Sequence, residues 1–203
     1  MIYQRLTVRA NGRNWQPLAE HIRQASLLAW QDRDVTVWGV WHGLFGLASN
    51  ELYVMLAGAT EVDVASQLPG DGTVVGNLVL QPTVRPESRE PCTTPGLYVF
   101  RTFEVNNSDV DEVAALSKQA WATFETDEAY RARPMGLFCE ADRSAACGTM
   151  LLVTWYDGLG SWQTSRTPAP EARAIFRQRH ELTHATAAVA TRLVELEGLE
   201  VKS

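Results

Sequence analysis

The sequence lacks several features that would point to a common functional class. No segment approaches the roughly 20 apolar residues that cross a bilayer, and the first residues, MIYQRLTVRA, do not form a secretory signal. No stretch is rich in Lys or Arg, and the net charge is −6, so neither nucleic acid nor a membrane surface is an expected partner. We therefore expect a soluble, cytoplasmic protein.

Cysteine is scarce and the familiar catalytic motifs are missing. The three cysteines, Cys92, Cys139 and Cys147, are an odd number without a C-x-x-C pair, which argues against a disulfide framework and a cysteine zinc site. The chain contains no G-x-S-x-G elbow, phosphate-binding glycine loop or dinucleotide fingerprint. Hydrolase, kinase and Rossmann functions are thereby excluded, and no cofactor is implied.

The chain does contain many hydrophobic residues and an internal repeat. Hydrophobic residues make up 45% of its 203 residues, so a large core can form without disulfides. The segment MIYQRLTVRANG aligns with GLYVFRTFEVNN, which places Tyr3 on Tyr98 and Thr7 on Thr102. An amphipathic helix is predicted after each of these strands, with Ser108 as the N-cap of the second helix.

Both copies continue with the same order of elements. A strand with the tripeptide Gly-Leu-Phe comes next, followed by a strand of nearly continuous apolar residues that is expected to be buried on both faces. A helical segment follows, which is short in the first copy and precedes a closing strand, and long in the second copy. The Gly-Leu-Phe strands are expected around 43–45 and 136–138, and the apolar strands at 51–58 and 149–158. The short helical segment and the closing strand of the first copy are expected at 61–72 and 73–82, and the long helix of the second copy from about Pro170 to Leu196.

The order β-α-β-β-α-β is that of a ferredoxin-like fold, an antiparallel sheet with helices on one face. The predicted class is α+β, with two tandem ferredoxin-like repeats whose antiparallel sheets pack face to face as an intrachain dimeric α+β barrel. Self-association into a homo-oligomer is a further expectation, because exposed sheet edges tend to pair. The predicted boundaries are 1–82 for repeat 1, 83–95 for a Pro-rich linker and 96–203 for repeat 2.

Arg101 is the main candidate for a functional residue. In the predicted strand 97–105 it lies on the apolar face, which is assigned to the helices. A cation buried there costs several kcal/mol unless it is paired. The sequence leaves two partners open: an anionic ligand, or a carboxylate from Glu125, Glu128 or Glu171.

The string His180-Glu181-Leu182-Thr183-His184 matches the H-E-x-x-H zinc motif. If 170–196 is one helix, both histidines lie opposite its apolar face, and Glu195 is about 16 Å beyond His184, too far to be a third ligand. We therefore predict no metal site at His180 and His184 and reject a metallopeptidase.

Two motifs in the second copy carry a family resemblance. Tyr98, Arg101, Thr102 and Phe103 match a Y-x-x-R-T-Y strand, with Phe in place of the final Tyr. An aromatic strand then leads into a helix with an aromatic residue and an Arg, here Trp155, Tyr156, Trp162 and Arg166. In these motifs residues 96–195 resemble the NIPSNAP group of the dimeric α+β barrel superfamily. In the first copy Leu6 replaces Arg101, and Leu56 with Ala57 replaces Trp155 with Tyr156.

The resemblance implies a cavity between sheet and helices that accepts a small, largely apolar molecule, anionic or aromatic in character. It places members of the superfamily among cofactor-independent monooxygenases, isomerases, haem proteins and non-catalytic binding proteins, and a fold does not choose among these. If the protein is an enzyme, a cofactor-independent monooxygenase or isomerase is expected. The predicted ligand-binding residues are Tyr98, Arg101, Trp155, Tyr156, Trp162, Arg166 and His42.

Two other functions stay open. In a non-catalytic protein-interaction module, the aromatic residues would be ordinary core and the long C-terminal helix would supply a partner surface. In a haem protein, His42 would be the axial donor, although a packed histidine is the simpler interpretation of that residue. A cavity of roughly 300 Å³ or more that holds Arg101 without a carboxylate partner would favour a small-molecule ligand.

Overall fold

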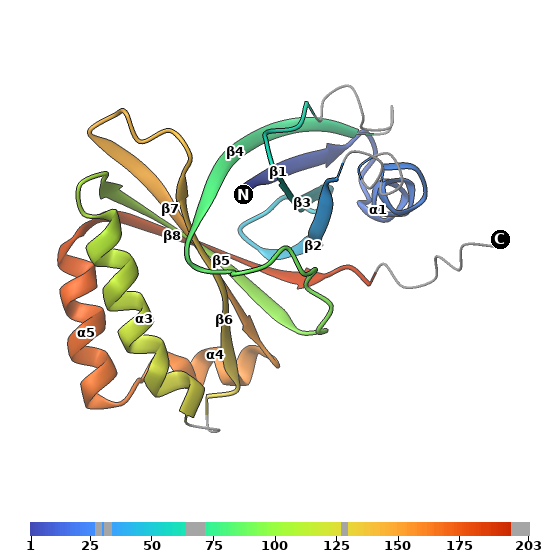
Figure 1. The fold of residues 1–203 in the computed structure, drawn as a ribbon. Helices are drawn as coiled ribbons and strands as arrows, with labels where there is room; N and C mark the ends of the chain where they lie inside the picture. Colours follow the sequence, from blue (N-terminus) through green and yellow to red (C-terminus); the bar gives the residue numbers. More distant parts are fainter. Residues whose placement is uncertain (27–29, 31–33, 64–71, 127–129, 196–203) are drawn as a thin grey trace. The chain divides into compact units, whose positions relative to one another are not determined.

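The computed structural model of the protein describes residues 1–26, 30, 34–63, 72–126 and 130–195 (Figure 1). Over these residues the chain is an α+β protein with eight strands, four α-helices and one π-helical turn. It divides into two compact units, each a ferredoxin-like unit, as the sequence predicted. Unit 1 comprises Met1–Val79, Arg89–Pro95 and Arg192–Ser203, and unit 2 comprises Leu80–Ser88 and Gly96–Thr191.

Unit 1 is built on the antiparallel strand order β1-β3-β2. All residues of the apolar segment ELYVMLAG are buried, which agrees with the prediction that this strand is covered on both faces. A proline at the start of α1 suits the helix N-terminus, where no backbone donor is needed. The elements are β1 (Ile2–Ala10), α1 (Gln16–His21), η1 (Ile22–Ser26), β2 (Thr36–Phe45), β3 (Glu51–Gly58) and the first part of β4 (Gly72–Arg85).

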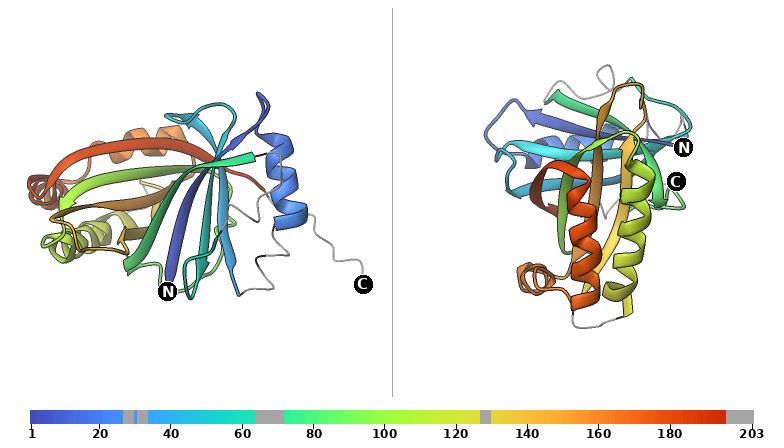
Figure 2. Two further views of the ribbon diagram at one scale, coloured as in Figure 1. Left: turned by 90° about the horizontal axis from the view of Figure 1, so that it is seen from above. Right: turned by 90° about the vertical axis from the view of Figure 1, so that its left-hand side faces the viewer.

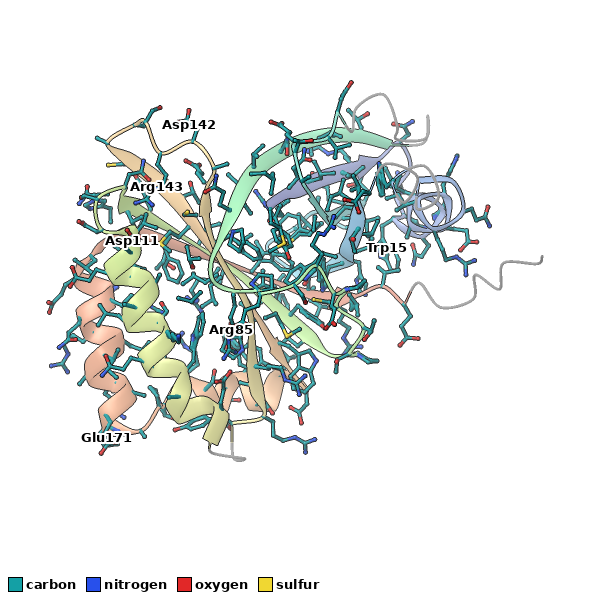
Figure 3. All side chains as sticks on the ribbon, in the orientation of Figure 1. Trp15, Arg85, Asp111, Asp142, Arg143 and Glu171 are labelled. Carbon is teal, nitrogen blue, oxygen red and sulfur yellow. The ribbon has the colours of Figure 1, made fainter. Side chains whose placement is uncertain are left out.

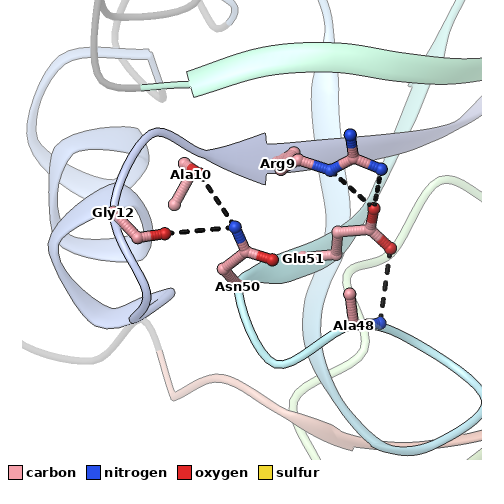
Figure 4. A network of polar contacts seen from close by, with 6 residues as sticks. All are labelled: Arg9, Ala10, Gly12, Ala48, Asn50 and Glu51. Carbon is pink, nitrogen blue, oxygen red and sulfur yellow. Dashed lines mark hydrogen bonds and ion pairs between the residues drawn. The ribbon is translucent and has the colours of Figure 1, made fainter.

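A polar network ties the end of β1 to β3 in unit 1 (Figure 4). Arg9 and Glu51 are register partners, and two guanidinium nitrogens of Arg9 donate to Glu51 Oε1 at 3.0 and 2.7 Å. The Asn50 amide donates to the carbonyl oxygens of Ala10 and Gly12, both at 3.1 Å. These bonds fix the start of β3 against the end of β1.

Unit 2 has the strand order β8-β5-β7-β6-β4, with α3 and α5 side by side (Figure 2). Phe103 and Val105 from β5 pack with Val113 and Trp121 from α3, so the face that carries Arg101 is the helix-covered face, as predicted. The elements are β5 (Leu97–Asn106), α3 (Val110–Thr126), β6 (Ala132–Glu140), β7 (Cys147–Tyr156), α4 (Leu159–Ser165), α5 (Pro170–Glu181) and β8 (Thr183–Leu193).

The strand registers confirm the repeat and correct one detail of its alignment. Both β2 and β6 carry a bulge at the same place, just before Gly39 and just before Gly136. The equivalent of Gly136-Leu137-Phe138 is therefore Gly39-Val40-Trp41, and the match to 43–45 by identical letters was wrong by four residues. In each unit the aromatic ring two residues later folds back over the bulge glycine, so that an added Cβ would overlap the Trp41 or Phe138 ring.

The segment after α5 is also different from the prediction. Residues 183–193 form strand β8 rather than the second half of a long helix, because α5 ends at Glu181. The segment THATAAVATRL contains three threonines and one valine, which favour strands, among four alanines, which do not. Within unit 2, the fully buried Thr191 donates its hydroxyl to the Tyr98 carbonyl at 3.0 Å, which joins β8 to β5.

Some smaller expectations also change. The helix α3 begins at Val110, and the Asp109 carbonyl accepts the first helical bond from Val113, so Asp109 takes the capping position predicted for Ser108. The strand β4 continues to Arg85, inside the range 83–95 predicted as linker. The short helical segment predicted at 61–72 lies mostly outside the described residues. No helix in the described ranges has the length and apolarity needed to cross a membrane.

We predict that the two bulge glycines are required for stability. An alanine Cβ at Gly136 would lie 2.5 Å from Phe138 Cε2, so Gly136→Ala should lower the free energy of unfolding by about 1–3 kcal/mol, and Gly39→Ala should do the same. Urea unfolding measures this. Gly12→Ala is the control, since nothing lies within 4 Å of its added Cβ, and equal stability of all three variants would contradict the prediction.

The three free thiols should differ in reactivity. Burial raises the pKa of Cys92 to about 12 and raises the pKa of Cys139, whereas Cys147 is exposed. A higher thiol pKa means less reactive thiolate at a given pH, so iodoacetamide at pH 8 should label Cys147 in the folded protein and spare the other two. Mass spectrometry of peptides, with urea-unfolded protein as the control, gives the result; early labelling of Cys92 would contradict it.

Candidate functional site

Unit 2 contains a cavity of about 470 Å³ on the helix-covered face of its sheet. Alternate residues of β5 and of β7 form the sheet wall, because side chains on one face of a strand recur at every second position. Ala132 and Pro134 of β6 extend this wall, and the other walls come from α3, α5, the end of α4 with the segment after it, and the start of β8. The lining residues are Val99, Arg101, Phe103, Trp121, Ala132, Pro134, Leu152, Thr154, Tyr156, Ser165, Arg166, Pro168, Arg173, Phe176, Arg179, His180, Thr183 and Thr186.

Four arginines line this cavity, and no Asp or Glu is among its described lining residues. Arg101 comes from the middle of β5, Arg166 from the end of α4, and Arg173 and Arg179 from α5. Arg101 and Arg179 are partly buried, whereas Arg166 and Arg173 are exposed. The cavity therefore has cations at two depths.

Arg179 is held in place by rings and one hydroxyl. Its guanidinium lies over the Phe103 ring at 5.0 Å and over the Phe176 ring at 4.9 Å, and it donates to the buried Ser117 hydroxyl at 3.3 Å. Burial, and then repulsion from Arg101, lower the pKa of Arg179 to about 10. The side chain is thus still a cation at neutral pH, and its surroundings disfavour that charge.

The surroundings of Arg101 also disfavour its charge. Its pKa is lowered, first by burial and then by repulsion from Arg166, while Tyr156 acts in the opposite direction. Arg101 therefore experiences the charges of neighbours on both α4 and α5. A group of like charges that is partly removed from water favours the binding of an anion.

The carboxylates named as partners of Arg101 do not meet it in the described part of the chain. Glu125 instead binds Arg85, with an Nη2 to Oε2 distance of 3.0 Å. Glu171 is exposed in the first turn of α5 (Figure 3). Glu128 lies outside the described residues. No ion pair of Arg101 with a described carboxylate exists, so the alternative of a structural salt bridge to Glu125 or Glu171 is ruled out.

The structure brings three of the predicted binding residues together and places four elsewhere. Arg101, Tyr156 and Arg166 line the cavity. Tyr98 and Trp155 lie one residue out of phase with the lining positions of β5 and β7, on the opposite face, and Tyr98 is fully buried there. Trp162 is half-buried on α4 but is not a lining residue.

His42 belongs to unit 1, where its ring stacks on Trp15 with centroids 4.5 Å apart and planes 5° apart. Its pKa is lowered, mainly because burial disfavours the imidazolium. A packed histidine was the simpler interpretation of this residue, and its stacking fits that interpretation. It is not among the residues of the unit 2 cavity.

The residues that sequence reasoning missed are on α5 and β8. Arg173, Phe176, Arg179 and His180 form one face of α5, at helical spacing, and that face lines the cavity. The helical spacing of Arg173 and Arg179 is visible in the sequence, but the prediction of one helix over 170–196 placed its apolar face elsewhere. Because α5 ends at Glu181, the face that carries Arg173 and Arg179 is the one that meets the cavity.

The H-E-x-x-H string does not have the geometry of a zinc site. His180 is in the last turn of α5, whereas His184 is in β8, so they do not lie one turn apart on a helix. His184 Nε2 instead lies 3.0 Å from Asn106 Oδ1. The described residues contain no group of three or more His, Cys, Asp or Glu side chains that could hold a metal ion.

Unit 1 has no counterpart of the arginine cluster at the equivalent strand positions. The registers place Leu6 opposite Val54 and Arg101 opposite Leu152. They also make Ala57 and Gly58 the equivalents of Trp155 and Tyr156, one residue later than the alignment by letters. Leu6, Val54 and Leu56 are buried in an apolar cluster with Trp30 and others. The wall that is cationic in unit 2 is aliphatic core in unit 1.

Comparison with known proteins finds the fold and no closer relationship. No family model matches the chain, and no curated protein does. Solved structures match over nearly the whole length. An anthrone oxidase-like protein is 12% identical, covering 95% of this chain and 91% of that one, with a TM-score of 0.59. A mutant of chlorite dismutase from Candidatus Nitrospira defluvii is 9% identical, covering 96% and 92%, with a TM-score of 0.61.

A third solved structure is also similar in fold at low sequence identity. A ferredoxin fold protein from Listeria monocytogenes, related to antibiotic biosynthesis monooxygenases, is 8% identical, covers 96% of each chain and has a TM-score of 0.53. The chain thus shares the ferredoxin-like, dimeric α+β barrel fold with monooxygenase-related proteins and chlorite dismutases. At these identities the fold alone is shared.

We predict that Arg101 weakens the fold when no ligand is bound. Arg101→Met keeps the length of the side chain and removes its repulsion with Arg166 and Arg179, so the free energy of unfolding should rise by about 1 kcal/mol. Urea denaturation of ligand-free protein measures this. Arg177→Met, on the exposed side of α5, should leave stability unchanged. A loss of stability on Arg101→Met would contradict the prediction.

Proposed function

We propose that unit 2 binds a small organic anion with an apolar, partly aromatic body. The observation that carries this proposal is a cavity of about 470 Å³ lined by four arginines and no described carboxylate. The volume is within the range of small-molecule sites, which is roughly 300–1,000 Å³. An oxyanion would supply the anionic acceptor that Arg101 and Arg179 do not have among the described lining residues.

The remaining walls support an apolar body for this ligand. Phe103, Trp121 and Phe176 contribute rings, and Val99 and Leu152 contribute aliphatic side chains. Such walls bind a ligand by burying its apolar surface and by contacts between rings, while the few polar groups fix its orientation. The chemistry therefore favours an aromatic or enolic acid over a small inorganic anion.

If the site is catalytic, its chemistry suits proton abstraction from a phenol or from a carbon next to a carbonyl. The anion that forms in this step would be stabilised by Arg101 and Arg179, since preorganised cations in a partly dry site act strongly on developing charge. His180 is the lining side chain whose neutral imidazole can accept the proton, and the Tyr156 hydroxyl can donate a hydrogen bond to the anion that forms. This step is common to a cofactor-independent oxygenase and an isomerase, and the fold is shared with an anthrone oxidase-like protein.

The NIPSNAP-like relationship is part of this proposal. It is supported by the motif residues Tyr98, Arg101, Thr102 and Phe103, and no family model matches the chain. Haem is not part of the proposal, because its predicted axial donor, His42, belongs to unit 1 and stacks on Trp15. The interaction module is disfavoured by an open cavity around an arginine without a described carboxylate partner.

The proposal is tested by native mass spectrometry of protein purified from its own host. We expect a co-purifying organic anion on the wild type and on Arg177→Gln, an exposed arginine of α5 outside the cavity. The double variant Arg101→Gln/Arg179→Gln should lose it, because two charge-assisted contacts, each worth about 1.5–3 kcal/mol, are removed. Wild-type protein that is empty, and whose melting temperature does not respond to a panel of aromatic carboxylates, would overturn the proposal.

A further inference from the structure

The four cavity arginines form two groups at different depths, and this distribution restricts the ligand further. Arg101 and Arg179 make an inner pair, since both are partly buried and each guanidinium is within electrostatic range of the other. Arg166 and Arg173 make an outer pair, which is exposed. All four belong to unit 2.

Arg173 and Arg179 are too far apart along α5 to serve one carboxylate, although Arg166 is near enough to Arg101 to act on its charge. Arg173 and Arg179 are six residues apart on α5, which is about 9 Å along a helix axis. The inner end of this face is capped by rings, because the Arg179 guanidinium lies over Phe103 and Phe176. The outer end is polar, since Arg173 donates to the Pro168 carbonyl at 3.3 Å.

No described carboxylate neutralises either group. The ion pairs of the described residues in unit 2 are Arg85 with Glu125, Arg131 with Asp157 and Arg143 with Asp111, and none of these arginines lines the cavity. One anionic group on the ligand would compensate the inner pair and leave the outer pair as it is. A second anionic group, on the other side of an apolar spacer, would compensate both.

Resting on the proposed function, we propose that the ligand is a dianion, with two anionic groups separated by a flat apolar spacer. The inner group is held by Arg101 and Arg179, the spacer lies against Phe103, Phe176 and Leu152, and the outer group is held by Arg166 and Arg173. An aromatic dicarboxylate has this chemistry. Arg166 and Arg173 are then the residues that distinguish a dianion from a monoanion of the same shape.

The test compares terephthalate with its monomethyl ester by isothermal titration calorimetry. The two probes share ring and length, but the ester has only one charge. Wild-type protein should bind terephthalate at least about tenfold more tightly, the effect of one charge-assisted contact. Arg166→Gln/Arg173→Gln should abolish this preference while keeping the affinity for the ester. Both residues are exposed, so this variant should fold normally, and Arg177→Gln is the matched control.

The outcomes separate the two proposals. Arg101→Gln should weaken binding of both probes, because the inner group is common to them. Equal affinity of the wild type for the two probes, or an unchanged preference in the outer double variant, would overturn the dianion and leave the binding of organic anions standing. Failure of both probes to bind wild-type protein would overturn the proposed function together with the dianion.

Discussion

The organisation of the site depends on the charge of one strand residue. Arg101 occupies a position on the helix-covered face of β5 whose equivalent in the other repeat, Leu6, is fully buried in an aliphatic core. A guanidinium there cannot be accommodated by close packing alone, since it requires either water, a carboxylate or an anion. The structure provides a cavity, and it adds Arg166 and Arg179 in place of a carboxylate. The repulsion among these cations is the property on which the proposed binding function rests.

The two repeats have the same strand arrangement but differ in whether the space beside the sheet is packed or open. Their bulges, strand registers and ring-covered glycines are equivalent, so the sheets are constructed in the same way. In unit 1 the equivalent strand positions are aliphatic and closely packed, which favours stability. In unit 2 some of that packing is replaced by an open, cationic volume, which we expect to lower stability and which carries the proposed binding function. The first repeat thus has the same fold as the second, but at the equivalent strand positions it has no cationic cavity wall.

Sequence reasoning predicted the strands up to β7 in their order along the chain, the tandem repeat and the face on which Arg101 lies, because strand alternation and apolar runs are local signals. It could not define the site fully. The segment after Glu181 contains alanines, threonines and a histidine motif, and it was compatible with a helix until its pairing with β5 was known. The cavity needs the side chains of α5 to face those of β5, and that is a tertiary relationship. The arginines of α5 were therefore missed, although they are spaced at helical intervals.

The family-like motif divides between the two faces of the sheet, and this division separates fold from function. Tyr98 and Trp155 are on the face opposite the cavity, whereas Arg101 and Tyr156, next to them in the motif, line it. Changes at the cavity-facing positions of β5 and β7 can alter the chemistry of the site while the opposite face keeps its packing. Proteins that share the fold at about 10% identity can therefore carry different activities. The opposite-face residues of the motif lie away from the cavity, and only Arg101, Tyr156 and their neighbours on α4 and α5 bear on the proposed ligand.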